Sequence, residues 1–274
     1  MKRLFHFFQK RPSGPEPDLQ EPLLLSYRLG TLQGIGRRMQ QEDAYGWLHA
    51  SDVVSIKEKG LLAMVADGMG GMMDGQAASA TAISSLASQF QTLLHDRDIP
   101  EQLCQMVQNA SVAVHEIVHG YGGTTLVLCF FFEEKLYFVS VGDSYLYLKR
   151  GGQLYRLNRE HNVRSRLLME SVQDKTMDPA CTEGNKELAA VTRFLGMEEL
   201  PEVDCFRIPY PLEEGDVILL CSDGVAGVME EESILQCLNE KTAPLMCQAM
   251  DACIQGMALP YQDNYTALVI QCGY

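Results

Sequence analysis

Carboxylate side chains recur beside apolar segments along this chain of 274 residues. They occur at five sites: Glu42-Asp43, Asp67, Asp143, Asp223 and Asp263. A carboxylate at the end of a buried strand is costly unless it is paired or binds a metal ion. No comparable set of Lys or Arg accompanies these acids. The pattern therefore points to bound cations.

The donor types at these sites suit hard divalent ions. Oxygen ligands without His or Cys clusters are those that Mg²⁺ and Mn²⁺ prefer. Several carboxylates can hold two ions roughly 3.5–4 Å apart and lower the pKa of a bridging water into the neutral range, which makes a hydrolytic site. Gly68, Gly70 and Gly71 would let the backbone approach such ions, and a main-chain carbonyl can serve as a ligand.

Each site taken alone has a simpler interpretation. Asp-Gly and Asp-Asn after a strand often form turns and nothing more. Arg38 lies four residues before Glu42, and its guanidinium could bind two phosphate oxygens or equally form a surface ion pair. A dinucleotide or P-loop site is excluded, because the chain has neither G-x-G-x-x-G in a βαβ unit nor G-K-[ST].

The elements that must position these acids can be read from composition and periodicity. Apolar, β-branched or alternating segments predict strands at 61–66, 124–132, 135–141, 145–149, 153–157, 203–208, 216–221 and 265–271. Helices are expected at 77–94, 102–118, 231–238 and 243–257. The polar, weakly patterned segment 158–190 is expected to hold a helix and a variable segment.

The order of these elements predicts the fold class. Tight turns at Glu133-Glu134 and Gly151-Gly152 make neighbouring strands antiparallel. The helices come in blocks of two rather than one per strand, which argues against a doubly wound parallel sheet. We therefore predict an α+β fold, a four-layer α-β-β-α sandwich of two antiparallel sheets flanked by helix pairs.

Composition bounds the functional classes. The chain is 46% hydrophobic and 21% charged, as in ordinary globular proteins. Its 22 Lys and Arg against 36 Asp and Glu give a net charge of −14, which argues against non-specific binding of nucleic acid. An acidic protein that acts on anions needs local cations, such as metal ions or a positioned arginine.

The first 22 residues predict a tail that precedes one domain over 23–274. Residues 1–11 are basic without an acid, and residues 12–22 contain four prolines, so they are expected to form a frayed terminus and an extended linker. No apolar run reaches the ~18 residues of a membrane-spanning helix. Contact of residues 1–11 with a membrane surface is the alternative.

Cysteine usage indicates a reducing compartment. The nine cysteines form no C-x-x-C pair, and most stand in apolar runs. Reduced, buried thiols in a cytoplasmic protein explain this better than a disulfide framework.

In their order along the chain, the acidic segments resemble the PPM (type 2C) family of metal-dependent protein serine/threonine phosphatases. The matching stretches are 38–44 (RMQQEDA), 67–71 (DGMGG) followed by Gly75 and Ala78-Ser79, 123–125 (GTT), 141–144 (VGDS), 220–224 (LCSDG) and 263–266 (DNYT). They cover about residues 27–272, and the Met in DGMGG is the form seen in bacterial members.

The resemblance implies a phosphoserine/phosphothreonine phosphatase with two Mn²⁺ or Mg²⁺ ions and an attacking water between them. It implies that Asp67 bridges both ions and that the Gly68 carbonyl completes the coordination of one. Asp223 and Asp263 would bind the other ion. Asp67, Asp223 and Asp263 are therefore the expected catalytic carboxylates.

The resemblance assigns roles to four further residues. Arg38 matches the arginine that binds the substrate phosphate. Asp143 matches a position that helps to bind a third, weaker ion. Glu42 and Asp43 match outer-shell or water-mediated supports of the metal site.

The chain departs from the family pattern at several positions. Met69 stands where some members have a His proposed as general acid, so a bound water would have to protonate the leaving group. Tyr145 replaces the Arg usual after GDS, and 160–162 (EHN) replaces a common Asp-His-Ser. Residues 163–190 match the flap that faces substrate, and their specificity is not readable.

Two other functions share these features. A pseudophosphatase, or a partner-binding regulatory protein of the same fold, would keep the fold without turnover, but such proteins usually lose a metal carboxylate. A phosphatase dedicated to one regulatory protein would share the chemistry and differ only in its partner. The expected partners are phosphorylated proteins, the substrates of a serine/threonine kinase.

Overall fold

The computed structural model describes residues 25–50, 53–70, 74–174, 186–201 and 203–273. The strands are β1 (Ser26–Gly34), β2 (Asp43–Leu48), β3 (Leu61–Met69), β4 (Gly123–Thr124), β5 (Leu126–Phe132), β6 (Lys135–Val141), β7 (Tyr145–Arg150), β8 (Gln153–Arg156), β9 (Asp204–Cys205), β10 (Tyr210–Pro211), β11 (Val217–Cys221) and β12 (Tyr265–Gly273). The helices are α1 (Val53–Lys59), α2 (Asp74–Phe90), α3 (Ile99–Val118), α4 (Val163–Asp174), α5 (Asp223–Ala226), α6 (Glu231–Cys237) and α7 (Ala243–Met257). The predicted tail at 1–22 lies outside the described residues, and the domain boundary at residue 23 stays a prediction.

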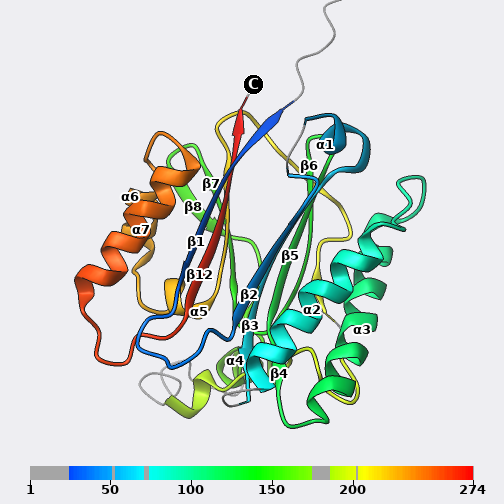
Figure 1. Cartoon of the computed structure of the whole chain (residues 1–274), viewed down its shortest axis with the longest axis vertical. Coiled ribbons are helices and arrows are strands. Elements are labelled where there is room, and N and C mark those ends of the chain that lie inside the picture. The colour runs from blue at the N-terminus through cyan, green and yellow to red at the C-terminus, as the bar shows by residue number, and fades with distance from the viewer. Residues whose placement is uncertain (1–24, 51–52, 71–73, 175–185, 202, 274) are drawn as a thin grey trace, which may run out of the picture.

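Two antiparallel sheets stack face to face between two helical layers (Figure 1). Sheet I has the strand order β1-β12-β11-β7-β8, and sheet II has the order β10-β6-β5-β3-β2, with β4 and β9 paired to β3 and β6. Helices α6 and α7 cover the outer face of sheet I, and α2 and α3 cover that of sheet II. The predicted four-layer sandwich is confirmed.

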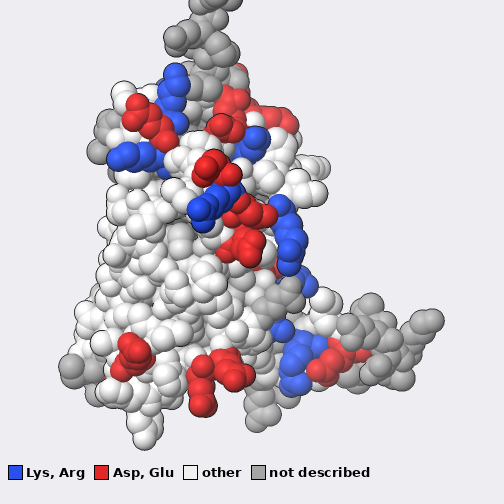
Figure 2. All heavy atoms as spheres, turned by 90° about the vertical axis from the view of Figure 1, so that its right-hand side faces the viewer, with Lys and Arg blue, Asp and Glu red and all other residues white. Residues whose placement is uncertain are grey.

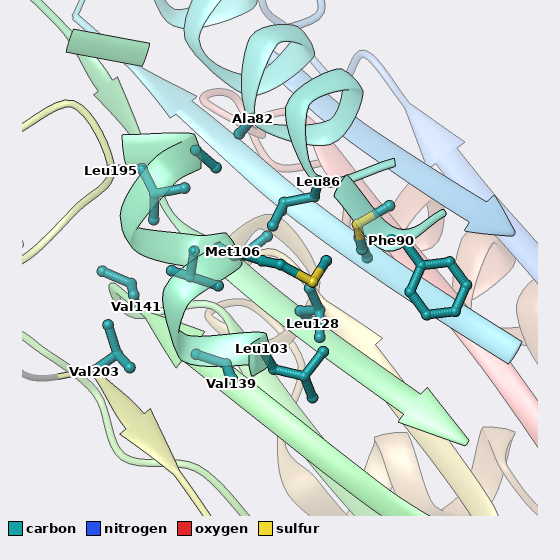
Figure 3. Close-up of a cluster of buried hydrophobic side chains, with 14 of the residues drawn as sticks. Ala82, Leu86, Phe90, Leu103, Met106, Leu128, Val139, Val141, Leu195 and Val203 are labelled. Carbon is teal, nitrogen blue, oxygen red and sulfur yellow. The ribbon is translucent and has the colours of Figure 1, made fainter. Parts of the chain in front are cut away.

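Strands in the middle of the sandwich are buried on both faces. In β3, Leu62 and Met64 point into the cluster beneath α2 and α3, of which Figure 3 shows a part. Their neighbours Leu61, Ala63 and Val65 point into the cluster between the two sheets. Because successive side chains alternate between faces, such a strand has to be apolar throughout. This explains the continuous apolar run that predicted it.

Some predicted strands have different bounds. β3 continues through Asp67 to Met69, because Gly68 and Met69 pair with Thr124 and Gly123 of β4. The predicted strand 124–132 is broken at Thr125, where the chain leaves β4 and enters β5. The predicted strand 203–208 is wrong beyond Asp204–Cys205, because only these two residues pair with β6.

Several elements were not predicted, among them the short β10 and α5, and also β1 and α1. β1 is an edge strand with two glycines and mostly half-exposed side chains, paired with β12 alone, so its apolar signal is weak. α1 has seven residues, none of them buried, so it has no apolar face from which to predict it.

Two expectations about thiols and membranes can be compared with the described residues. The eight cysteines among them are all free, as predicted for reduced thiols. No helix in the described part of the chain combines the length and the apolar character needed to cross a membrane.

Removing a side chain from the layer between α3 and sheet II should destabilise the protein. Leu103 of α3 is fully buried in this cluster (Figure 3). We expect Leu103→Ala to lower the free energy of unfolding by about 2–5 kcal/mol, because it leaves a cavity that packed neighbours cannot fill. Urea denaturation would measure this change. Gln105→Ala, at an exposed position of the same helix, is the control and should cost far less. Equal losses in the two variants would contradict this account of the core.

Candidate active site

The acids singled out in the sequence converge at one end of the sandwich, the lower end in Figure 1. A cleft of about 440 Å³ lies there. Seven of the eight predicted site residues line it: Arg38, Glu42, Asp67, Gly68, Asp143, Asp223 and Asp263. They come from both sheets, since β2, β3, β6, β11 and β12 begin or end at this rim. The eighth residue, Asp43, does not line the cleft.

Asp67 is held inside a strand rather than in a loop after one. Its carbonyl accepts hydrogen bonds from the Thr125 N–H at 2.8 Å and the Thr124 hydroxyl at 2.9 Å. Its own N–H donates to the Thr125 hydroxyl at 3.1 Å. Across the ladder Asp67 pairs in register with Asp43 of β2, which places two carboxylates at one rung. The Asp67 backbone is therefore fixed where these acids meet.

Gly68 is required by the close approach of neighbouring backbone. A Cβ at this position would lie 2.1 Å from the Gly75 carbonyl oxygen and 2.6 Å from that of Glu42. Ser79 of α2 also donates to the Glu42 carbonyl, at 2.6 Å. Helix α2, β3 and the segment before β2 are thus packed together at the cleft with no room for a side chain at residue 68.

Asp43 lies behind the cleft and is 5% exposed. Its Oδ2 accepts a hydrogen bond from the Ser222 hydroxyl at 2.8 Å, and that hydroxyl oxygen accepts from the Thr266 N–H at 3.0 Å. Its Oδ1 is buried and has no hydrogen-bond partner. Asp43 therefore connects β2 to the residue before Asp223 and retains a free acceptor.

Arg38 is positioned over the cleft by an ion pair. One of its terminal nitrogens lies 2.5 Å from the Asp263 carboxylate, and this contact raises the pKa of Arg38 further. Both side chains are substantially exposed, at 53% and 40%, so the pair can exchange partners at little cost.

Asn264 is a structural residue of the site to which the sequence analysis assigned no role. Its side-chain oxygen accepts from the Glu42 N–H at 2.8 Å, and its amide group donates to the carbonyls of Ile35 and Gln40. The segment that carries Arg38 and Glu42 is thereby fastened beside Asp263. An Asn directly after a predicted ligand was the available signal.

The carboxylates of the cleft oppose one another's ionisation. Withdrawal from water and the neighbouring acids Asp43, Asp223 and Asp143 raise the pKa of Asp67 well above its ordinary value. Withdrawal from water and the charge of Asp223 raise the pKa of Asp143 to about 7. The pKa of Asp223 is also raised, by withdrawal from water and by the charge of Asp263. Opposite charge brought into the cleft would reverse these shifts.

The cleft therefore fits divalent cations chemically. It offers oxygen donors that are crowded, withdrawn from water and short of counter-charge, which is what a hard ion requires. In the described part of the chain, however, no three or more His, Cys, Asp or Glu side chains are already grouped as ligands of one ion. Asp263 instead contacts Arg38, and Gly68 would offer a carbonyl rather than a side chain.

Tyr145, which replaces the arginine usual after GDS in the family, has an arginine packed against it. The guanidinium of Arg156 lies 4.1 Å from the centre of the Tyr145 ring and pairs with Glu160 at 2.8 Å. A cation thus still stands over residue 145 and beside the acid at 160, although it comes from β8.

Comparison with known proteins agrees with this geometry. The chain matches the protein phosphatase 2C family over residues 35–256. It is similar to the serine/threonine phosphatase stp of Listeria innocua, with 29% identity over 228 residues, or 80% of this chain and 87% of that protein.

Solved structures share the fold. The S. agalactiae serine/threonine phosphatase superposes with a TM-score of 0.75 at 22% identity, covering 90% of this chain and 99% of that one. The catalytic domain of the serine/threonine phosphatase PstP, solved with 2 manganese ions, gives a TM-score of 0.71 at 24% identity, covering 91% and 100%. The chain belongs to the protein phosphatase 2C (PPM) family, and it is a phosphoprotein phosphatase of the bacterial type.

The crowded acids predict an unusual pH dependence in the presence of chelator. An unfolded aspartate titrates near pH 4, whereas Asp143 in the folded protein has a pKa of about 7. Between these values the folded state binds more protons than the unfolded state, so stability falls as the pH rises. In excess EDTA we expect the Tm to drop by about 5 °C between about pH 5 and about pH 8.

Asp143→Asn is the variant that tests this cause, because residue 143 can then no longer lose a proton. The fall of the Tm with pH should become smaller, while Asp67 and Asp223 keep part of it. Asp96→Asn, at an exposed position, is the matched control and should keep the slope of the unaltered protein. A Tm that rises with pH over this range in EDTA would contradict the explanation.

Proposed function

We propose that the protein hydrolyses phosphoserine and phosphothreonine in protein substrates and depends on Mn²⁺ or Mg²⁺. The observation that carries the proposal is the convergence of five carboxylates and one arginine in one cleft. Serine/threonine specificity is supported by the similarity to the Listeria phosphatase. The substrates would be proteins phosphorylated by a serine/threonine kinase, and the site of action would be the cytoplasm.

The metal ligands are proposed residue by residue. Asp67 would bridge two ions, the Gly68 carbonyl would complete one of them, and Asp223 and Asp263 would bind the other. Asp143, with its strongly raised pKa, would contribute to a third and weaker site. PstP, a structural relative, was solved with 2 manganese ions, which supports a two-ion centre here.

The residues around these ligands would support and orient them. Asp43, with one unpartnered oxygen, and Glu42 at the rim would hold ordered waters on the ions. Two such ions, when bound, would supply a bridging water of lowered pKa as the nucleophile toward phosphorus. Arg38 would bind two of the phosphate oxygens, because its planar guanidinium matches their spacing.

Protonation of the leaving group must come from water. Met69 lines the cleft and has no proton to donate at the position where some relatives carry His. The serine or threonine oxygen of the substrate would therefore take its proton from an ordered water. A substrate whose leaving group departs without protonation should then be hydrolysed with little dependence on this water.

A non-catalytic role is the alternative. A partner-binding protein of this fold would not need every carboxylate, yet Asp67, Asp223 and Asp263 all line the cleft. The complete set favours an enzyme.

Asp223→Asn should abolish most turnover. The amide replaces a charged ligand, so release of phosphate from a phosphothreonine peptide in Mn²⁺ should fall by at least about 100-fold. Excess chelator should reduce the unaltered protein to the same level. Asp96→Asn supplies the matched control and should retain full activity. Undiminished phosphate release by Asp223→Asn would refute the assignment.

Arg38→Ala should separate metal binding from substrate binding. Arg38 neutralises Asp263 in this structure, so an ion that binds Asp263 has to displace the guanidinium. Without it, calorimetry should show Mn²⁺ binding that is tighter by about threefold to tenfold. The KM for a phosphopeptide should rise in the same variant, because a phosphate contact is lost. Weaker Mn²⁺ binding by Arg38→Ala would contradict this competition.

A further inference from the structure

A second hollow lies next to the cleft and has the opposite charge. It has a volume of about 720 Å³ and is lined by the segment 156–170 together with Thr192 and Arg193. Its charged residues are Arg156, Arg159, Arg166, Arg193, Glu160 and Glu170. We call it the arginine hollow.

The lining of the arginine hollow carries more positive than negative side chains, in contrast to the lining of the cleft. Four arginines against two glutamates line it, whereas the cleft has one arginine against five carboxylates. The whole chain carries a net charge of −14. Figure 2 shows that much of the face of α2 and α3 carries few charges, whereas Lys and Arg lie together with Asp and Glu in its upper part and along its right edge. Anions near this surface are therefore drawn to the hollow.

Two of these arginines form ion pairs that differ in how readily a ligand could replace them. Arg166 pairs with Glu170 at 3.2 Å within α4, and both side chains are more than half exposed. Arg159 contacts Asp204 at 3.1 Å, and its side chain is 63% exposed. The exposed pair of Arg166 contributes little to stability, so an incoming anion can take over its N–H groups. The Asp204 carboxylate is largely buried and accepts from two nitrogens of the Arg159 guanidinium, so Arg159 is held more firmly.

Arg156 differs from the other arginines of the hollow. Its guanidinium lies over Tyr145 and pairs with the half-buried Glu160, so it forms the floor. Its Nε and one terminal nitrogen are buried without a hydrogen-bond partner, which leaves two donor nitrogens unsatisfied beneath the hollow although the charge is paired with Glu160.

The arginine hollow and the cleft share a wall. Val191 lines the cleft and the next residue, Thr192, lines the hollow. Asn162, in the hollow, forms an isolated bridge with Val191. His161 exchanges backbone and side-chain hydrogen bonds with Gly142, which precedes Asp143 in the cleft. A polypeptide advances about 3.3 Å per residue when extended, so a chain bound in the cleft reaches the hollow within a few residues.

We propose that the arginine hollow is a subsite for an anionic side chain of the substrate, a few residues from the phosphorylated one. This inference rests on the proposed phosphatase activity and narrows its substrate class to acidic or multiply phosphorylated segments. The guanidinium group suits both carboxylate and phosphate, because its N–H fork can bind two oxygens of either. The two sources share this chemistry, and the experiment distinguishes them.

The test compares three phosphothreonine peptides that differ only at the flanking positions. One carries alanines, one carries glutamates, and one carries a single non-hydrolysable phosphonate in place of a second phosphate. Steady-state phosphate release in Mn²⁺ gives kcat/KM for each. We expect the glutamate or the phosphonate peptide to exceed the alanine peptide by about tenfold, mainly through KM, and this preference should shrink as salt is added.

Arg166→Glu is the diagnostic variant, because its side chain is exposed and its pair with Glu170 is a surface contact. It should reduce the preference for the anionic peptide by at least about fivefold. Arg28→Glu, in β1 at the opposite edge of sheet I, is the matched charge reversal elsewhere and should keep the preference. Circular dichroism would show that both variants are folded.

The outcomes separate the two proposals. If no peptide releases phosphate, the proposed function fails. If all three peptides are hydrolysed with equal kcat/KM, or if Arg166→Glu keeps the full preference, the subsite is refuted while the phosphatase activity stands. A preference for the phosphonate alone would assign the hollow to a second phosphate, and a preference for glutamate would assign it to acidic sequence.

Discussion

Mutual repulsion among carboxylates in one cleft is the constraint on which the rest of this structure depends. Glu42 and four aspartates line the same space, and three of them, Asp67, Asp143 and Asp223, have pKa values raised by withdrawal from water and by their neighbours. Such groups would separate if the chain allowed it. They cannot, because their backbones belong to strands or to tightly bonded strand ends, so protons or cations must relieve the repulsion. In the described residues Arg38 is the one basic side chain that lines the cleft.

Burial of apolar side chains in the sandwich keeps these carboxylates together. The central strands bury side chains on both faces, so a shift of one residue in register would turn each side chain toward the wrong layer. Register is therefore strongly determined, and with it the position at which each strand ends. Hydrogen bonds position the residues at the rim. The hydroxyls of Thr125 and Ser144 are hydrogen-bonded at 2.7 Å, and the Asn264 amide donates to two carbonyls of the segment that carries Arg38. Apolar burial sets the distances, and these few hydrogen bonds set the orientations.

The sequence predicted elements whose residues have a distinctive composition, and it missed features that depend on contacts between distant parts of the chain. Strands buried on both faces, such as β5 and β6, are continuous apolar runs and were predicted nearly to the residue. β1 was missed because an edge strand is half exposed, and 203–208 was predicted too long because its apolar residues pack without a partner strand. The acids were identified because their types recur at strand ends. The Arg38–Asp263 pair, the extension of β3 through Asp67 and the charge of the arginine hollow all arise from residues far apart in sequence, and no local pattern encodes them.

The opposite charges of the cleft and the arginine hollow suit them to different proposed functions, hydrolysis with bound cations in the cleft and anion binding in the hollow. A phosphate group approaching the cleft alone meets one arginine and five carboxylates, so binding there depends on cations bound first. An anion approaching the arginine hollow meets a net positive lining that is already built into the chain. On the two proposals above, recognition through the hollow would not require metal, whereas hydrolysis in the cleft would. An acidic segment could be held by the protein before the metal centre is complete, and its affinity would report on the hollow alone. The same arrangement would let a chain with a net charge of −14 favour anionic partners, because attraction would be confined to one small surface.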